Sequence, residues 1–279
     1  MWLIHKICDL LLRLWFFVFD RLVLYPAMCY LSPVFGIQFM NLGYWPTETS
    51  AARDMQMKAV VEECSSETDL DRPHYYLYER ALMIHPHYPL LKGLKFLEVG
   101  CGQGNGMRWM KKSHPRIKSI RGVDSCTLAN KSIISGDAHH LPFGDNQFDV
   151  EIFLSVLNVE SSHLYHDCEQ FFRECARVLK KDGYLCWIDL RYQKQADETR
   201  RKAIRAGLIE ERWENITENI LLGIERTAAR YDEILRRAPF FIRLFSSSLR
   251  ATYCAPGTHT YARFVSKEKG YYTALWRNN

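Results

Sequence analysis

FLEVGCGQGNG, residues 96–106, is the stretch of sequence that decides the fold. An apolar strand that contains Glu98 runs into alternate glycines, and the helix-forming residues MRWMKK follow. The glycines are Gly100, Gly102, Gly104 and Gly106. Alternate glycines let the backbone turn tightly and approach a ligand closely, and the start of the next helix offers unpaired amide donors. The stretch therefore predicts a loop that binds a nucleotide-like cofactor.

The glycine spacing leaves two classes of cofactor open. The dinucleotide fingerprint GxGxxG works by related physics, so the loop alone is ambiguous. Here the glycines follow GxGxGxG, and an acidic residue stands inside the preceding strand. This combination favours a carboxylate that contacts the positively charged amino-acid part of a cofactor over a loop that holds only a pyrophosphate.

Strand and helix patterns alternate through the region that follows. Strands are expected at residues 94–100, 118–124, 131–137, 148–157 and 183–190, and helices at residues 104–112 and 165–180. Such alternation predicts an α/β protein with a doubly wound parallel sheet, in which ligands bind at the carboxyl ends of the strands. Asp124 ends the second strand, where an acidic side chain would meet ribose hydroxyls. Asp137 and Ala138 end the third strand.

Other segments surround the expected sheet. Residues 47–73 are polar with one short helix, which is typical of a surface segment or lid. Residues 196–238 repeat Ile, Leu and Trp at helical spacing and predict a helical cap beside the carboxyl edge of the sheet. The aromatic and β-branched residues from Ser248 onward suggest terminal strands. We expect three parts: an N-terminal segment over residues 1–46, a lid and a helix over residues 47–93, and a cofactor-binding domain over residues 94–279.

The N-terminal segment is strongly apolar. Its charged residues Lys6, Asp9, Arg13 and Asp20 fall on one narrow stripe of a helix expected over residues 2–25. These charges argue against a membrane span, and the early aspartate argues against a signal peptide. We expect an apolar helix that lies in a membrane interface. A helix packed on the protein itself or on a partner is an alternative, and a true membrane anchor is another.

The composition excludes several classes of protein. Apolar residues make up 47% and charged residues 25% of the 279 positions, so disorder is excluded and a core forms without disulfide staples. The net charge of +5 is too small and too scattered to predict a nucleic-acid partner. Nine cysteines without CxxC spacing predict neither a zinc site nor a disulfide framework. We expect a cytoplasmic protein without a metal, associated with a membrane surface through residues 1–40.

Four stretches of the chain, in order, resemble the successive motifs of the class I S-adenosylmethionine-dependent methyltransferases. They are EVGCGQGNG, GVD, GDAHHLPFGDNQFDV and RECARVLKKDGYLCWIDLR. The resemblance implies a Rossmann-like, mostly parallel seven-stranded sheet that binds S-adenosylmethionine. It further implies that Glu98 to Gly104 line the methionine part, that Asp124 with Ser125 binds the ribose hydroxyls, and that Asp137 with Ala138 meets the adenine.

A narrower resemblance joins residues 157–191 to the mycobacterial phthiotriol and phenolphthiotriol dimycocerosate methyltransferases. The stretches YYLYERA and GTHTYARF are similar as well. This resemblance implies transfer of a methyl group to a hydroxyl of a long-chain lipid. An apolar or lipid-like small molecule is therefore the expected substrate, which agrees with the apolar N-terminus.

One connection is shorter than is usual in that class. Only twelve residues separate Asp124 from Asp137, whereas a parallel crossover usually needs about a dozen in addition to its strands. The adenine side of the cofactor site is therefore expected to be shortened. On this ground a catalytically inactive cofactor-binding subunit is an alternative function. A thiol or amine methyltransferase is another.

The loop SVLNVESSHLYHD, residues 155–167, holds the candidates for proton transfer. Glu160 and His163 are three residues apart, so a helical turn would place them on one face. His163 would then accept a proton from the substrate while Glu160 orients the imidazole. Alternatively, Glu160 caps the next helix and His163 and His166 are surface or packing residues. In a third interpretation, Asn158 or Glu160 contacts the amino group of the cofactor.

Several aromatic and histidine side chains have ordinary structural interpretations. Tyr75, Tyr76 and Tyr78 predict an aromatic stripe in a packed helix, with closure over the cofactor as the alternative. We interpret His139 and His140 as solvated turn residues, and His85 and His87 as residues of a loop around Pro86.

Overall fold

The computed structural model describes residues 36–126, 130–144 and 153–279. The chain divides into two units, residues 1–38 and residues 39–279. The apolar helix expected over residues 2–25 lies outside the described residues. Within the described ranges, no helix combines the length and the apolar composition that crossing a bilayer requires.

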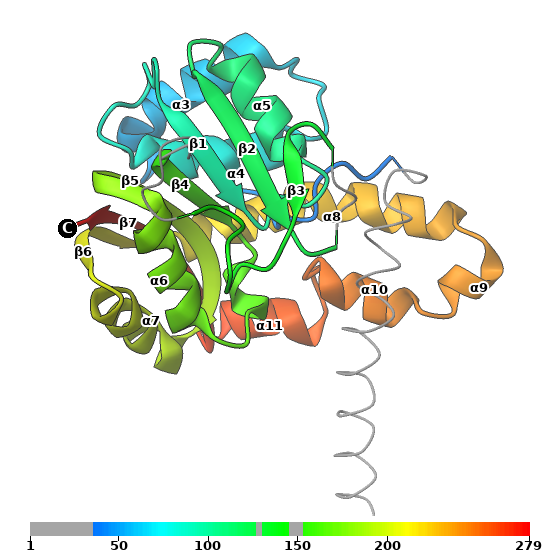
Figure 1. Cartoon of the computed structure of the whole chain (residues 1–279). Coiled ribbons are helices and arrows are strands. Elements are labelled where there is room, and N and C mark those ends of the chain that lie inside the picture. The colour runs from blue at the N-terminus through cyan, green and yellow to red at the C-terminus, as the bar shows by residue number, and fades with distance from the viewer. Residues whose placement is uncertain (1–35, 127–129, 145–152) are drawn as a thin grey trace, which may run out of the picture. The chain divides into compact units, whose positions relative to one another are not determined.

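A sheet of seven strands forms the centre of the second unit, in the order β3-β2-β1-β4-β5-β7-β6 (Figure 1). The first five strands are parallel, and β7 runs antiparallel to both of its neighbours. The strands are β1 (Lys95–Val99), β2 (Ser119–Asp124), β3 (Ile133–Ser135), β4 (Phe153–Val159), β5 (Leu179–Tyr192), β6 (Leu208–Asn215) and β7 (Lys269–Asn278). The prediction of a doubly wound, mostly parallel seven-stranded sheet is confirmed.

Helices cover both faces of this sheet, because successive residues along a strand point to opposite sides. In β5, Cys186 and Ile188 are buried in one core with α4 and α8, whereas Leu185 and Trp187 are buried in another with α6 and α7. The helices are α3 (Ala51–Cys64), α4 (Arg72–Met83), α5 (Asn105–Ser113), α6 (Cys168–Val178), α7 (Gln193–Arg205), α8 (Thr217–Arg237), α9 (Phe240–Arg243), α10 (Ser246–Thr252) and α11 (His259–Val265).

The segment before β1 is more ordered than the sequence suggested. Instead of a lid with one short helix, residues 51–64 form α3, which packs on α4. Asp54, Met57 and Val61 are its buried residues, and their spacing places them on one helical face. Phe39 and Leu42, expected in the N-terminal apolar segment, are buried in the core of the second unit.

The expected helical cap at residues 196–238 is only partly helical. Helices α7 and α8 occupy its two ends, but Leu208–Asn215 is the strand β6, so the prediction of a continuous helical block is wrong there. Gly207, with φ of 93°, ends α7, and the following residues pair with β7. Charged residues in β6 resemble a helix surface in sequence, but they are typical of an edge strand that must not pair further.

The chain between β6 and β7 forms an insertion of four helices, α8 to α11 (Figure 1). The expectation of several terminal strands is wrong, because residues 246–252 and 259–265 are helical and only β7 is a strand. Thr258 caps α11 by accepting a hydrogen bond from the amide of Tyr261. The two antiparallel strands therefore enclose a large helical insertion rather than a tight hairpin.

Candidate functional site

The carboxyl ends of β1, β2, β3 and β4 are connected by hydrogen bonds. The amide of Gly102 donates to Oδ2 of Asp124 over 2.8 Å, and the amide of Gly136 donates to the carbonyl oxygen of Asp124 over 3.1 Å. Nδ2 of Asn158 donates to the carbonyl oxygen of Val99 over 2.9 Å. The structure thus brings together the strand ends that the sequence analysis singled out.

The connection from β2 to β3 is short, as predicted. Gly122 pairs with Ile133 and Asp124 with Ser135 in parallel register. Within residues 125–126 and 130–132, the described part of this connection, there is no helix. Oδ1 of Asn130 accepts hydrogen bonds from the amides of Ser132 and Ile133, which starts β3 without a crossover helix.

Glu98 is a fully buried carboxyl group in β1. The hydroxyl of Tyr78 donates to its Oε1 over 2.7 Å, while no described residue donates to its Oε2, which is buried as well. Burial raises the pKa of Glu98 to about 8. A buried carboxylate oxygen without a donor is costly alone and fits a cationic ligand group such as an ammonium.

The glycine loop approaches its neighbours closely at three positions, among them Gly104, where a Cβ would lie 2.8 Å from Cδ1 of Ile133. A Cβ at Gly100 would lie 2.3 Å from Oγ of Ser161, and a Cβ at Gly106 would lie 2.0 Å from Cζ of Tyr78. A Cβ at Gly102 would meet no atom within 4 Å. Gly104 has a φ of 76° and is the N-cap of α5. The loop is therefore closely packed on two sides and open at Gly102.

The residues expected at ribose and adenine lie along the next two strand ends. Oδ1 of Asp124 accepts a hydrogen bond from the amide of Cys126, and Ser125 is exposed. Asp137 has a half-exposed side chain whose Oδ1 accepts from the amide and from Nδ1 of His139, at 2.9 and 2.6 Å. Ala138 is buried in the core.

The two histidines after Ala138 have different environments. His140 is exposed, as predicted for a solvated turn residue. His139 is buried, which contradicts that prediction, because its Nδ1 bonds to Asp137 and its Nε2 accepts from the amide of Asp167. Its ring also lies over that of His166 with 3.9 Å between the ring centres.

Asn158 is fully buried at the end of β4. Besides Val99, its Nδ2 donates to Oγ of Ser161 over 2.6 Å. Its Oδ1 is buried and receives no hydrogen bond from a described residue. Asn158 therefore holds the loop after β4 against β1 and has one acceptor atom for a ligand.

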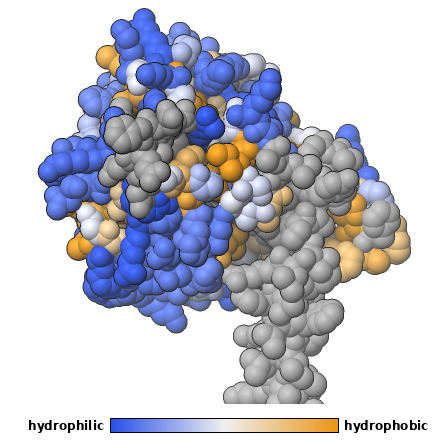
Figure 2. All heavy atoms as spheres, in the orientation of Figure 1, coloured by the Kyte–Doolittle hydropathy of each residue, from blue (hydrophilic) through white to orange (hydrophobic). Residues whose placement is uncertain are grey.

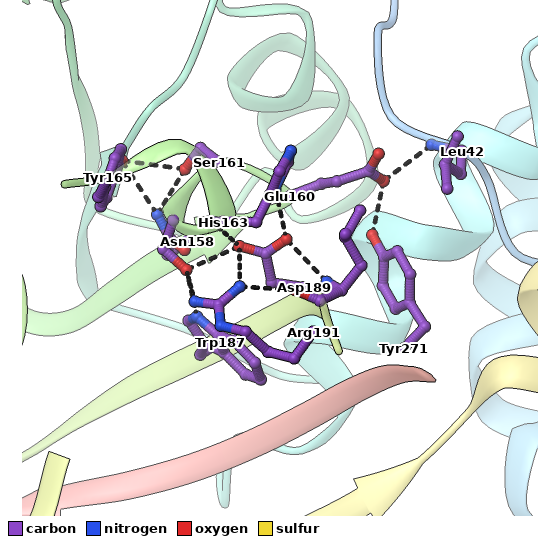
Figure 3. Close-up of polar contacts among 12 residues, drawn as sticks. Leu42, Asn158, Glu160, Ser161, His163, Tyr165, Trp187, Asp189, Arg191 and Tyr271 are labelled. Carbon is purple, nitrogen blue, oxygen red and sulfur yellow. Dashed lines mark hydrogen bonds and ion pairs between the residues drawn. The ribbon is translucent and has the colours of Figure 1, made fainter. Parts of the chain in front are cut away.

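His163 forms a pair with Asp189, a fully buried residue of β5 (Figure 3). Nδ1 of His163 lies 2.8 Å from Oδ1 of Asp189. The amide of His163 and the hydroxyl of Ser162 donate to Oδ2 of Asp189 over 2.9 and 2.7 Å, and Nη1 of Arg191 lies 3.2 Å from it.

The charges around Asp189 keep it ionised. Burial alone would raise its pKa, but the neighbouring charges of His163 and Arg191, with the hydrogen bonds, outweigh burial and hold the pKa well below its usual value. An ionised Asp189 requires a proton on Nδ1 of His163, which leaves Nε2 as the basic nitrogen of the neutral ring. The side chain of His163 is 25% exposed, so the ring is accessible.

Glu160 does not orient His163, and this prediction is wrong. Glu160 has a φ of 49°, so the backbone leaves the helical region there, and the 3₁₀ turn begins only at Ser162. Its Oε2 accepts from the amide of Leu42 and from the hydroxyl of Tyr271, at 2.8 and 2.6 Å. In Figure 3 the carboxyl group points toward these two partners and away from Asp189. Burial raises the pKa of Glu160 to about 8.

Sequence reasoning did not single out Asp189 or Tyr271 at the candidate site, and it named Tyr78 only as part of an aromatic stripe or of a closure over the cofactor. Asp189 stands at the carboxyl end of the otherwise apolar stretch GYLCWIDL, which is a signal for a buried functional carboxylate. Tyr78 and Tyr271 each donate to a buried glutamate, and no local pattern indicates this. The aromatic stripe is real, since Tyr76 is buried and Tyr75 stacks on Trp109.

Two further features of the described residues bear on the site. His85 is buried, and its Nε2 lies 2.9 Å from Oγ of Ser155, so it supports the sheet rather than a loop alone. Among residues 36–126, 130–144 and 153–279 no group of three or more potential metal ligands gathers.

The fold agrees with that of known methyltransferases. A family model described as a methyltransferase domain matches residues 97–187. A cyclopropane synthase of Mycobacterium tuberculosis has a similar structure, with a TM-score of 0.54 at 13% identity, covering 76% of this chain and 87% of that protein. The class of protein that this fold defines is the class I methyltransferase.

Relatives in sequence narrow the family. Phthiotriol/phenolphthiotriol dimycocerosates methyltransferase 1 of Mycobacterium ulcerans is 30% identical over 230 residues, 78% of this chain and 78% of that protein. A fatty-acid O-methyltransferase of Mycolicibacterium smegmatis is 32% identical over 164 residues, 55% of this chain and 58% of that protein. The chain belongs to the S-adenosylmethionine-dependent methyltransferase family that includes the phthiotriol/phenolphthiotriol dimycocerosates methyltransferases.

Proposed function

We propose that this protein transfers a methyl group from S-adenosylmethionine to a hydroxyl of an apolar, lipid-like small molecule. The observation that supports a hydroxyl acceptor is the pair of His163 and Asp189 at the carboxyl edge of the sheet, because a hydroxyl needs a base and a thiolate or an amine needs less help. The names of the relatives, which refer to phthiotriol lipids and fatty acids, support a lipid-like acceptor.

The residues present fit the cofactor. Oε2 of Glu98, buried and without a donor, would bind its ammonium group, and Oδ1 of Asn158 offers a second acceptor nearby. The backbone at Gly100, Gly102 and Gly104 would allow close approach of the methionine part. When bound, S-adenosylmethionine supplies an electrophilic methyl group on its sulfonium.

The next two strand ends would hold the nucleoside. Asp124 with Ser125 would accept the ribose hydroxyls, since an acidic side chain at the end of the second strand of such a sheet lies where the ribose binds. Asp137, with its half-exposed carboxylate, would meet the adenine amino group beside Ala138. The short connection between these strand ends would make that side of the site shallow.

His163 is the proposed catalytic residue. Its Nε2 would accept the proton of the substrate hydroxyl as the oxygen forms its bond to carbon. Asp189 is a positioning residue, because it holds the ring through Nδ1 and stabilises the imidazolium that results. Glu160 has a different part: with Tyr271 it fixes the backbone of Leu42 near the loop after β4.

Identification of the methylated product tests this proposal. The full chain is incubated with a total lipid extract and methyl-labelled S-adenosylmethionine, and the labelled species is isolated. We expect a methyl ether of a lipid, because a carboxylate, which would give a methyl ester, needs no base. Label found only on a thiol or an amine would contradict the hydroxyl acceptor. If the chain binds the cofactor but forms no labelled product, the result would support the inactive alternative.

A further inference from the structure

The C-terminal part of the helical insertion between β6 and β7, residues 234–267, is strongly positive. Residues 234–267 contain no Asp or Glu, while the whole chain has a net charge of only +5. Their basic residues are Arg236, Arg237, Arg243, Arg250, Arg263 and Lys267. The charge is therefore concentrated rather than scattered, contrary to the sequence analysis, and the remainder of the chain is close to neutral.

The same insertion exposes large apolar side chains around α9, a region that we call the α9 tip (residues 236–250). Phe240 is 71%, Leu244 65% and Phe245 46% exposed. Helix α8 leads from the sheet to this tip (Figure 1), and Figure 2 shows hydrophobic surface around α9. Exposed apolar side chains that gather in one place usually mark a surface that binds something.

Arginines surround these apolar side chains. Arg236 and Arg237 are 74% and 80% exposed, and each pairs with Glu233 of α8. Arg243 is exposed on α9 itself. A surface cavity of about 420 Å³ lies among these groups, lined by Leu235, Phe240, Leu244, Arg236, Arg243 and Arg250, with Asp232 paired to Arg250 at 2.8 Å.

We propose that the α9 tip docks on an anionic lipid bilayer. Apolar side chains flanked by arginines suit a bilayer surface, because the aromatic and aliphatic groups enter the headgroup boundary while the guanidinium groups bind phosphates and carboxylates. Residues 234–267 contain no acidic residue, and the adjacent Asp232 and Glu233 are paired with arginines, so little repulsion opposes an anionic surface. A surface that binds a protein partner would not need charges of a single sign.

The docking surface lies in the insertion, whereas the proposed site lies at the carboxyl ends of the parallel strands. Ile220 and Ile224 of α8 are buried in the same core as Leu42 and Tyr271, the two partners of Glu160. A bilayer bound at the tip would therefore lie at the far end of a helix whose first half packs in that core. This inference rests on the charge and exposure of the tip and stands whether or not the acceptor is a lipid.

Vesicle flotation of the full chain tests the proposal. We expect the protein to float with phosphatidylcholine vesicles that contain phosphatidylserine, and much less with phosphatidylcholine alone. Arg243→Glu replaces one favourable charge with an unfavourable one, so its affinity should fall by at least about fivefold. Leu244→Glu should fall by a similar or larger factor. The matched controls Lys181→Glu and Leu90→Glu, also at exposed positions, should float as the parent protein does.

Hydrogen exchange locates the contact, because the apolar residues 2–25 could float the chain by themselves. With phosphatidylserine vesicles we expect slower exchange of backbone amides in residues 240–249. Flotation without protection of these amides, or equal protection of them in the parent and in Leu244→Glu, would overturn the proposal. If Leu244→Glu changes the oligomeric state without any loss of vesicle binding, the proposal would also be overturned, because a second copy of the chain would then be what binds the α9 tip.

Discussion

The hydroxyl of Tyr78 in α4 donates a hydrogen bond of 2.7 Å to Glu98 in β1, and the ring of Tyr78 occupies the space that a side chain at Gly106 would need. One tyrosine thus connects the helix before the sheet with both parts of the glycine loop, the strand and the helix that follows it. The other carboxylate oxygen of Glu98 is buried and accepts no hydrogen bond from a described residue.

Gly106→Ala is expected to damage the site although it lies in a helix. Alanine in a helix is ordinarily better than glycine by about 1 kcal/mol. Here the new Cβ would lie 2.0 Å from Cζ of Tyr78, so we expect a loss of about 1–3 kcal/mol in the free energy of unfolding and weaker cofactor binding. Denaturant unfolding measures the first effect. In a Tyr78→Ala background the same substitution should cost little, and an equal cost in both backgrounds would contradict the packing argument.

Glu98→Gln is expected to change how stability depends on pH. Burial raises the pKa of Glu98 to about 8 in the folded chain, above its ordinary value of 4.5. The folded chain therefore holds this proton more tightly than the unfolded chain does. The contribution of the protonated carboxyl group to the free energy of unfolding is fully present below about pH 4.5 and is lost as the pH rises through 8. The variant should therefore match the parent near pH 4.5 and exceed it at pH 9, by up to about 1.4 kcal/mol for each pKa unit.

Thermal unfolding of both proteins without cofactor, across this pH range, measures the difference. The pKa of Glu160 is also raised to about 8, so Glu160 makes the same contribution to the pH dependence of stability in both proteins. This contribution cancels from the comparison. A difference that stays constant from pH 4.5 to pH 9 would mean that folding does not raise the pKa of Glu98.

His163→Gln is expected to lower kcat by about 10²- to 10⁴-fold while cofactor affinity stays within about twofold, because the base acts only on the acceptor proton. Asp189→Asn should also lower kcat, and the double variant should be no worse than His163→Gln, because Asp189 acts through His163. His166→Gln is the matched control, an exposed histidine in the same loop. Turnover that survives His163→Gln would favour a thiol or amine acceptor.

Tyr271→Phe is expected to loosen the segment around Leu42. The substitution removes the hydroxyl that donates to Oε2 of Glu160 over 2.6 Å and leaves the amide of Leu42 as the remaining donor. Losing a hydrogen bond to a buried carboxyl costs about 1–3 kcal/mol. Hydrogen exchange at the Leu42 amide should accelerate. Tyr184→Phe, in the neighbouring strand β5, should leave that exchange rate unchanged; if both variants behave alike, Glu160 does not hold this segment.

Sequence patterns predicted those parts of the fold and of the candidate site that depend on residues close together in the chain. The loop after β1, the carboxylate in that strand and the acidic end of β2 follow from FLEVGCGQGNG and Asp124, because glycine and strand geometry act over a few residues. The pairs Tyr78–Glu98 and His163–Asp189 join residues 20 and 26 positions apart, so they depend on how elements pack.

Two of the wrong expectations have a similar physical origin. Glu160 and His163 have helical spacing, but the positive φ at Glu160 excludes the turn that would bring them together. The charged residues of β6 suggest a helix surface, but pairing with β7 decides their conformation. In both cases tertiary structure overrides a local pattern.

Calorimetric titration of the full chain with S-adenosylmethionine tests the central claim, that the strand ends around Glu98 and Asp124 form a cofactor site. We predict saturable binding at one site, at least about tenfold weaker in Glu98→Gln because a charge-assisted hydrogen bond is lost. The exposed control Glu67→Gln should bind as the parent does. No saturable heat at millimolar cofactor, or equal affinity in Glu98→Gln and the parent, would contradict the account.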